Sequence, residues 1–465
     1  MDKKVDVHGG TIWTMIWHVL KMSLKFVSNI ILTRLLTPEM YGIASIGNTI
    51  INGINMLSNL GIEQSVVRSH RNDDHFYQTA WTLHVLRGLI LTVIIVLLAK
   101  PFAWFYEVDG LAAFLLIVAV SSLAMGFLNI EAVRVLRHAN LRKLAIIDNV
   151  GTVLGLGIMV LWAWISPSYV ALAVGSLATT TLFAIGTYLA FPRQNCRIHF
   201  DKEAMIDMIS FGKWVLISTI LLFATMQIDR LALGKLVTMH VIGLYSIAWL
   251  WASIPNQILE QWAHRVYFPL VSQYVRDATS MNTIWIVRRL YITIATVAAI
   301  VMYAVSDILV SILYSEQYQG VSLMIRQFSI VFLLYSIEAS YSIVLDAQGR
   351  PKEKIFGQVL SIILLSTALL PVFYWADIAG VIALLALASC VRIIWVVYKI
   401  FTYKLAVFGL DIVYVGAYFP IAMLMHFIVS INSNRLYQVS AALVLGCAAL
   451  IITLLIYRRL RRICA

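Results

Sequence analysis

Residues 35–46 read LLTPEMYGIASI, and residues 236–247 read LVTMHVIGLYSI. At this offset of 201 residues, Leu, Thr, Gly, Ser and Ile match at five of twelve positions, and Asn55 corresponds to Asn256. Each copy follows one long apolar segment and precedes another, so each marks the turn between two helices. The two copies predict a fold built from a repeated helical bundle; chance similarity between apolar segments is the alternative.

The composition is that of a membrane protein. Of 465 residues, 61% are hydrophobic and 12% are charged, which is about half of the ~25% charged residues of a typical soluble domain. Apolar runs of about 20 residues recur along the chain, and each is long enough to cross a hydrocarbon layer of about 30 Å as a helix. Barrel strands would instead alternate between apolar and polar residues. The sequence therefore predicts an all-α membrane protein.

About fourteen transmembrane helices are predicted. They cover residues 11–33, 40–60, 77–99, 109–130, 144–165, 168–191, 208–233, 241–263, 290–312, 322–345, 355–375, 377–398, 411–430 and 436–457. Spans 1–6 form a first six-helix bundle in residues 1–200 and spans 7–12 a second in residues 201–403. Residues 404–465 add two C-terminal spans and a basic tail. Because six is even, the pseudo-symmetric bundles share one orientation, an arrangement that places a substrate path at their interface.

The basic residues give the orientation. Lys and Arg number 24 in the termini and the connections of one face, and four on the other. Basic loops remain on the cytoplasmic side, so both termini are predicted there, in a multi-pass protein of the bacterial inner membrane. The net charge of +12 is spread over short loops that face anionic membrane lipids. A nucleic-acid partner is therefore not expected.

Three cations lie near the centre of predicted spans. Lys21 and Lys25 are one turn apart in span 1, and Arg87 is central in span 3. A charge at this depth is costly unless it faces a cavity or a partner, and a cationic path favours an anionic substrate. These three residues are therefore the candidate binding site for phosphate or pyrophosphate. The alternative for the lysines is a structural role, in which they pair with buried carboxylates.

Amides follow one face of span 2 and recur in its counterpart, span 8. Amide groups can bond sugar hydroxyls as donors and as acceptors, but they also hold membrane helices together. Both interpretations stay open for the candidate sugar-binding residues, which are Asn48, Asn52, Asn55, Asn256 and Gln257.

Few acids lie inside the spans. Glu260, Glu338 and Asp229 are candidates for carrying a coupling H⁺ or Na⁺, although Asp229 beside Arg230 also fits a structural ion pair. The spacing of the four cysteines fits no metal site, and no catalytic residues, metal or other cofactor are expected.

Several short motifs resemble those of a known family. Residues 32–43 (LTRLLTPEMYGI) and 59–62 (NLGI) resemble the signature of the polysaccharide transporter family, which includes the Wzx-type flippases. Residues 211–214 (FGKW), 227–230 (QIDR) and 243–247 (GLYSI) are similar to that family's second bundle. The turns at residues 141–143 (LRK) and 349–352 (GRPK) fit the same pattern. The resemblance covers roughly residues 10–400.

The resemblance implies a fold and a substrate. The fold is that of the multidrug/oligosaccharidyl-lipid/polysaccharide exporter superfamily, with two six-helix bundles around a central cavity that opens to alternate sides. The implied function is to flip a polyprenyl-diphosphate-linked oligosaccharide from the inner to the outer leaflet for O-antigen, capsule or exopolysaccharide synthesis. A polysaccharide polymerase and chain-length machinery are the implied protein partners.

Two other function classes stay open. A cation-coupled multidrug exporter would share the fold, but it would need an acidic cavity for cationic drugs. A membrane polymerase or glycosyltransferase would need a large extramembrane loop or an aqueous pair of acids. Because the central charges are basic and the loops are short, a transporter and not an enzyme is expected.

Overall fold

The computed structural model describes residues 7–58, 61–69, 71–137, 142–277, 281–403 and 411–430. Throughout these ranges the regular structure is helical, as the predicted fold class requires. By packing, the chain divides into two compact units, residues 1–243 and 244–465. The predicted boundary at residue 200 lies between two helices of the first unit, and the division into two six-helix bundles stays a prediction.

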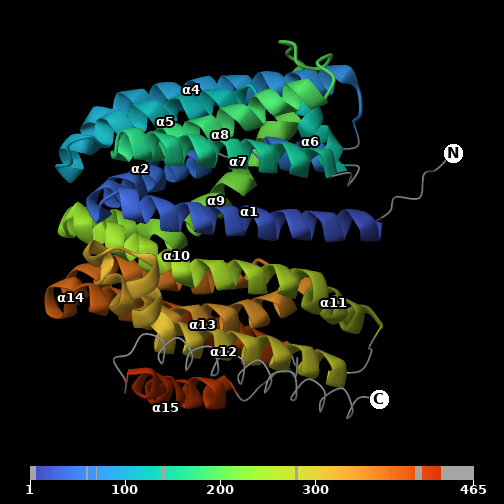
Figure 1. Ribbon diagram of the computed structural model, residues 1–465. Coiled ribbons are helices and arrows are strands. Elements are labelled where there is room, and N and C mark those ends of the chain that lie inside the picture. Colours follow the sequence, from blue (N-terminus) through green and yellow to red (C-terminus); the bar gives the residue numbers. More distant parts are fainter. Residues whose placement is uncertain are drawn as a thin grey trace. The chain divides into compact units, whose positions relative to one another are not determined.

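The first unit contains nine helices and the start of a tenth within the part of the chain that the structure describes. They are α1 (Val7–Leu35), α2 (Pro38–Leu57), α3 (Ile62–Arg68), α4 (Asp74–Tyr106), α5 (Leu111–Gly126), α6 (Ile130–Arg137), α7 (Arg142–Ile165), α8 (Tyr169–Ala190), α9 (Lys202–Leu236) and α10 (Met239–Trp262). In Figure 1, α4, α5 and α8 run side by side with α7, and these helices pack on one another in that order.

Small residues allow the membrane helices of this unit to approach closely. A Cβ on Gly88 of α4 would lie 2.6 Å from the Cα of Gly126 in α5, and one on Gly155 of α7 would lie 2.7 Å from the Cα of Thr179 in α8. Close backbone approach at small residues is the usual way in which membrane helices associate, because lipid supplies no hydrophobic driving force between them.

The repeated turn predicted from the sequence appears in the helix boundaries. Helix α1 ends at Leu35 and α2 begins at Pro38, while α9 ends at Leu236 and α10 begins at Met239. These two pairs of boundaries differ by 201 residues, which is the offset of the sequence repeat. Proline is well suited to the first position of a helix because its missing N–H would have no partner there.

The two glycines of the repeat make reciprocal contacts between α2 and the first turn of α10. A Cβ on Gly42 would lie 1.9 Å from the carbonyl oxygen of Met239, and a Cβ on Gly243 would lie 1.8 Å from that of Pro38. Gly243 is the repeat counterpart of Gly42, and Met239 is that of Pro38. Equivalent residues of the two repeated turns therefore make equivalent contacts.

A polar network fixes the starts of α4 and α9 at the end of the unit that is predicted to be cytoplasmic. Arg71 donates to both carboxylate oxygens of Asp73 at 3.0 Å and to Asp201 at 2.6 Å. Asp73 caps α4 by accepting from the Phe76 N–H, and Asp201 caps α9. The hydrogen bonds from Arg71 lower the pKa of Asp73 to about 2 and also lower the pKa of Asp201.

The second unit continues α10 and adds the remaining described elements. They are the π-helix η1 (Ala263–Tyr267), α11 (Phe268–Asp277), α12 (Met281–Leu313), the 3₁₀ turn η2 (Glu316–Tyr318), α13 (Val321–Ala347), α14 (Glu353–Thr402) and α15 (Asp411–Ser430). Helix α13 packs on α11, α12 and α14, and α15 packs on α12.

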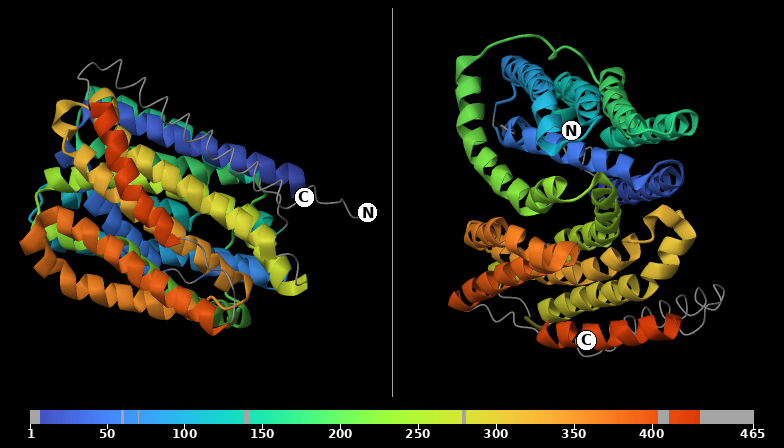
Figure 2. Two further views of the ribbon diagram at one scale, coloured as in Figure 1. Left: turned by 90° about the horizontal axis from the view of Figure 1, so that it is seen from below. Right: turned by 90° about the vertical axis from the view of Figure 1, so that its left-hand side faces the viewer.

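Helix α14 consists of two arms. Asp377 has φ 55° and ψ −150°, which no helix contains, and the chain changes direction there. The two arms appear as separate orange rods in Figure 2. The break falls at the boundary predicted between spans 11 and 12.

Six described helical segments are long and apolar enough to cross a membrane, or seven if α5 and α6, which meet at a bend of 67°, form one span. Helices α1, α2, α9 and α10 have 20 to 35 residues and are also long enough at about 1.5 Å per residue, but they carry more polar side chains. The protein is therefore a multi-pass membrane protein. The number of fourteen spans stays a prediction, and residues 436–457 lie outside the described residues.

Candidate functional site

The two lysines of α1 differ in their surroundings. The Lys21 ammonium lies 2.7 Å and 2.6 Å from the two carboxylate oxygens of Asp148 on α7, and both side chains are partly exposed, at 24% and 37%. The structural alternative considered for the lysines, pairing with a carboxylate inside the membrane, is thus what the structure contains at Lys21. Each charge lowers the cost of holding the other away from water.

Lys25, one turn further along α1, is exposed. It makes no ion pair or hydrogen bond with any other residue that the structure describes, and it interacts electrostatically with Lys21 and Asp148. Together these three side chains carry a net charge of +1. A free ammonium beside a neutralised pair is a suitable point of attachment for an anion, because Lys25 can bind it directly and Lys21 can exchange Asp148 for it.

Arg87 on α4 is bound to the end of α2. Its Nε donates to the Ser58 carbonyl at 2.9 Å and its Nη2 donates to the Asn55 carbonyl at 2.9 Å. The last carbonyls of a helix have no partner within it and attract positive charge, so Arg87 caps α2. Its electrostatic partner is Glu63 on α3, and no described contact joins Arg87 to the two lysines of α1.

The amides of α2 lie on the exposed side of that helix. Asn48 and Asn52 are exposed and Asn55 is partly buried, whereas the three residues between Asn48 and Asn52 are all buried. An exposed amide in the middle of a spanning helix would meet either hydrocarbon or a water-filled space, and hydrocarbon leaves its hydrogen bonds unmade. This stripe therefore favours a wet surface along α2.

The candidates in the second half are distributed over three helices. On α10, Asn256 is partly buried and Gln257 and Glu260 are exposed. On α13, Glu338 accepts a hydrogen bond from Arg392 of α14 at 2.8 Å, with side chains only 19% and 6% exposed. Glu338 thus neutralises a buried arginine in this state. Asp229 on α9 is buried, at 5% exposed.

The structure also contains charged contacts that sequence patterns did not indicate. The Lys21–Asp148 pair joins residues 127 positions apart. Arg288, which the sequence places among the basic residues of a loop, is 1% exposed on α12 and pairs with Asp411 of α15 at 2.7 Å. Its guanidinium lies 4.1 Å from the centre of the Tyr341 ring on α13. No local spacing connects such partners, so only tertiary structure could find them.

Comparison with known protein families identifies the family of this chain. Residues 31–323 match the family model described as polysaccharide biosynthesis protein, which is well over half of the chain. The protein belongs to this family.

Two known relatives share limited identity with this chain. The succinoglycan biosynthesis transport protein ExoT of Rhizobium meliloti (strain 1021) is 25% identical over 57% of this chain and 53% of its own length. The lipopolysaccharide biosynthesis protein WzxC of Escherichia coli (strain K12) is 22% identical over 75% of this chain and 72% of its own. The chain thus spans about half of ExoT and most of WzxC.

Solved structures with the same fold include the lipid II flippase MurJ in an inward closed conformation. It has a TM-score of 0.74 at 13% identity and covers 96% of this chain and 99% of its own. An inward-facing multidrug resistance MATE family transporter of the MOP superfamily follows, with a TM-score of 0.64 at 14% identity, over 83% of this chain and 96% of its own. These likenesses confirm the all-helical transporter fold, whereas the two six-helix bundles around a central cavity stay a prediction. The role of each candidate residue stays a prediction.

Proposed function

We propose that this protein is a flippase that moves polyprenyl-diphosphate-linked oligosaccharides from the inner to the outer leaflet of the bacterial cytoplasmic membrane by alternating access. The substrate would be a repeat unit of O-antigen, capsule or exopolysaccharide. Family membership and the flippase-like fold support the proposal. The observation that carries it is the exposed Lys25, without a partner among the described residues, beside the Lys21–Asp148 pair in the membrane.

The diphosphate is the costly part of such a substrate to move, because a charge taken into hydrocarbon loses its hydration. In this proposal, Lys25 binds the diphosphate first and Lys21 leaves Asp148 to bind it as well. The amides of Asn48 and Asn52 then exchange hydrogen bonds with sugar hydroxyls along a wet path. The polyprenyl tail remains in lipid throughout, so only the polar head needs the protein.

In this proposal, Arg87 has a different role from that of the two lysines. Its bonds to the end of α2 make it a positioning residue that holds the asparagine stripe in place. A guanidinium has five N–H donors, so the donors of Arg87 that do not bond α2 would also bind the diphosphate.

The driving force is a separate part of the proposal. A coupling H⁺ or Na⁺ would need a carboxylate that is accessible and not already neutralised. Glu260 is exposed on α10, whereas Glu338 is bonded to Arg392, so Glu260 is the better candidate. In this proposal both termini lie in the cytoplasm. A polysaccharide polymerase with its chain-length machinery would take the product on the outer face.

A multidrug exporter is the second candidate, and the likeness to the MATE family transporter favours it. The cations of α1 argue against it, because a cationic drug would be repelled by Lys25. A polymerase or glycosyltransferase is the remaining class, and the transporter fold gives it no support.

Deletion of the gene tests the three classes together. With a sugar label that cannot cross the membrane, a flippase mutant accumulates lipid-linked oligosaccharide only on the cytoplasmic face and loses the polymer. Single repeat units on the outer face with arrested chain growth would point to a polymerase. Unchanged polymer with greater sensitivity to drugs would point to an exporter.

A further inference from the structure

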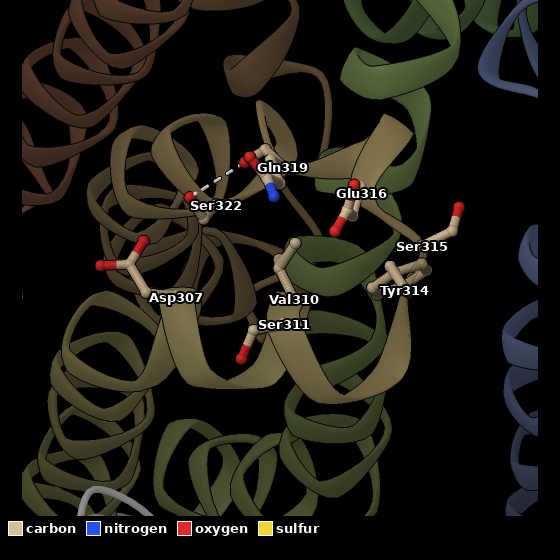
Figure 3. A pocket seen from close by; sticks show the side chains of 8 residues that line it. All are labelled: Asp307, Val310, Ser311, Tyr314, Ser315, Glu316, Gln319 and Ser322. Carbon is tan, nitrogen blue, oxygen red and sulfur yellow. Dashed lines mark hydrogen bonds between the residues drawn. The ribbon is translucent and has the colours of Figure 1, made fainter. Parts of the chain in front are cut away.

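A polar cavity lies where α12 meets α13 in the second unit. It has a volume of about 410 Å³ and is formed by the end of α12, the turn η2 and the start of α13. Figure 3 shows that the labelled side chains come from these three elements and from the short connections between them, and that they surround a common space. Six of the eight lining residues are polar: Asp307, Ser311, Ser315, Glu316, Gln319 and Ser322.

Two of these side chains have hydrogen-bonding capacity that the protein does not use. The Glu316 carboxylate and the Gln319 amide are exposed and have no side-chain partner among the residues that the structure describes. Ser311 and Ser322 donate to carbonyls of their own segments, at 2.9 Å and 3.1 Å, so their oxygens can still accept. The cavity therefore offers acceptors at several points and the amide donors of Gln319.

The charge of the cavity limits what can bind there. Asp307 pairs with Arg326 and lies 3.9 Å from His426, so Glu316 is the only lining charge without an ion-pair partner in the described part of the chain. A phosphate or another anion would be repelled by Glu316. A metal ion would prefer several carboxylates, and the described residues contain no group of three or more acidic, His or Cys side chains able to hold one.

A neutral ligand rich in hydroxyl groups fits this arrangement. A carboxylate can accept from two adjacent hydroxyls, and an amide can donate to one hydroxyl while it accepts from another. Hydrogen bonds to a charged acceptor are stronger than those between neutral groups. The volume lies within the range of small-ligand sites, so a short saccharide can enter.

We propose that this cavity is a saccharide-binding subsite that accepts neutral sugar units, with Glu316 and Gln319 as the residues that bind their hydroxyls. The connection between α12 and α13 carries no Lys or Arg from residue 313 to 321, which places it on the outer face by the distribution of basic residues. The subsite would receive the sugars of the flipped substrate, and in this respect the inference rests on the proposed function.

The test uses the full-length protein in lipid nanodiscs, because maltoside detergents would compete for the site. Saturation-transfer NMR with lactose, cellobiose and maltose measures binding to the wild type and to the variants Glu316→Ala and Gln319→Ala. The control variant is Gln327→Ala, whose side chain lines a neighbouring, more apolar cavity of about 300 Å³. Monodisperse elution and an unchanged melting temperature exclude unfolding of each variant.

We expect at least one disaccharide to bind the wild type and the control, and to bind Glu316→Ala about tenfold more weakly or not at all, since a hydrogen bond to a charged group is lost. Equal binding by Glu316→Ala and the wild type would overturn the inference. So would the absence of saccharide binding, or binding of Mg²⁺ or Ca²⁺ alone that depends on Glu316.

A measurement of lipid-linked oligosaccharide flipping by the same preparations distinguishes failure of this inference from failure of the proposed function. If the wild type flips a lipid-linked oligosaccharide but Glu316→Ala binds sugars normally, only the subsite is wrong. If saccharides bind in a Glu316-dependent way but no lipid-linked oligosaccharide is flipped, the proposed function fails and the subsite stands.

Discussion

The crossing of α2 with the first turn of α10 gives the sharpest prediction for the fold. In Gly42→Ala, the new methyl group would lie 1.9 Å from the Met239 carbonyl oxygen and 2.7 Å from its carbonyl carbon. Ordinary contacts between such atoms are about 3.5 Å, so the two helices must separate by about 1.5 Å. The neighbouring atoms belong to the backbone, which cannot turn aside as a side chain would.

The magnitude follows from two opposing effects. Alanine favours a helix over glycine by about 1 kcal/mol, whereas insertion of a methyl group into a packed contact costs about 1–3 kcal/mol or more. Because the clash is with backbone, we expect the cost to lie at the upper end and Gly42→Ala to be less stable by about 2 kcal/mol net.

Tryptophan fluorescence during thermal unfolding of the purified variants measures this effect. Gly157→Ala is the matched control, because this helical glycine of α7 has nothing within 4 Å of a new Cβ and the variant should melt at or slightly above the wild-type temperature. Gly243→Ala should repeat the loss, since its Cβ would lie 1.8 Å from the Pro38 carbonyl oxygen. The double variant should lose less than the sum, because the first substitution already separates the helices. A melting temperature of Gly42→Ala equal to that of Gly157→Ala would refute the reasoning.

Three further predictions concern charged residues. Lys25→Ala should lower the rate of flipping with little change in melting temperature, because Lys25 has no partner among the described residues; an unchanged rate would remove it from the site. Glu338→Gln should destabilise the protein by about 3–5 kcal/mol because it leaves Arg392 buried without a counter-charge. The double variant Glu338→Gln with Arg392→Met should recover much of this loss. Losses of the two single variants that add up in thermal unfolding would contradict the pairing. Because Arg71 lowers the pKa of Asp73 to about 2, the stability from this pair is complete above about pH 4 and lost as the pH falls towards 2; melting curves of Arg71→Gln should lack this part of the acid dependence.

Local patterns predicted the parts of the fold that local sequence determines. The apolar runs predicted the helices, and the repeat predicted the matching turns before Pro38 and Met239. The break between spans 11 and 12 was found at Asp377. These features depend on hydropathy, helix starts and turns, and each of these is determined by a few neighbouring residues.

The partners of the candidate site residues depend on tertiary structure and could not be predicted in the same way. Span 1 shows that Lys21 needs a neutralising partner, but nothing near it in sequence identifies Asp148. Likewise, Arg87 is central in its span, and only the packing of α4 reveals that it caps α2. Periodicity indicates which residues share one helix face, and it carries no information about the neighbouring helix.

Reconstitution tests the central claim most directly. The purified protein is placed in vesicles that carry a fluorescent polyprenyl-diphosphate oligosaccharide on one leaflet, and a sugar-modifying enzyme that cannot cross the bilayer reports how much label reaches the other leaflet. We predict transfer across vesicles that contain the wild type, and slower transfer with Lys25→Ala. Transfer no faster than in protein-free vesicles, under a pH or Na⁺ gradient of either direction, would contradict the proposed flippase function.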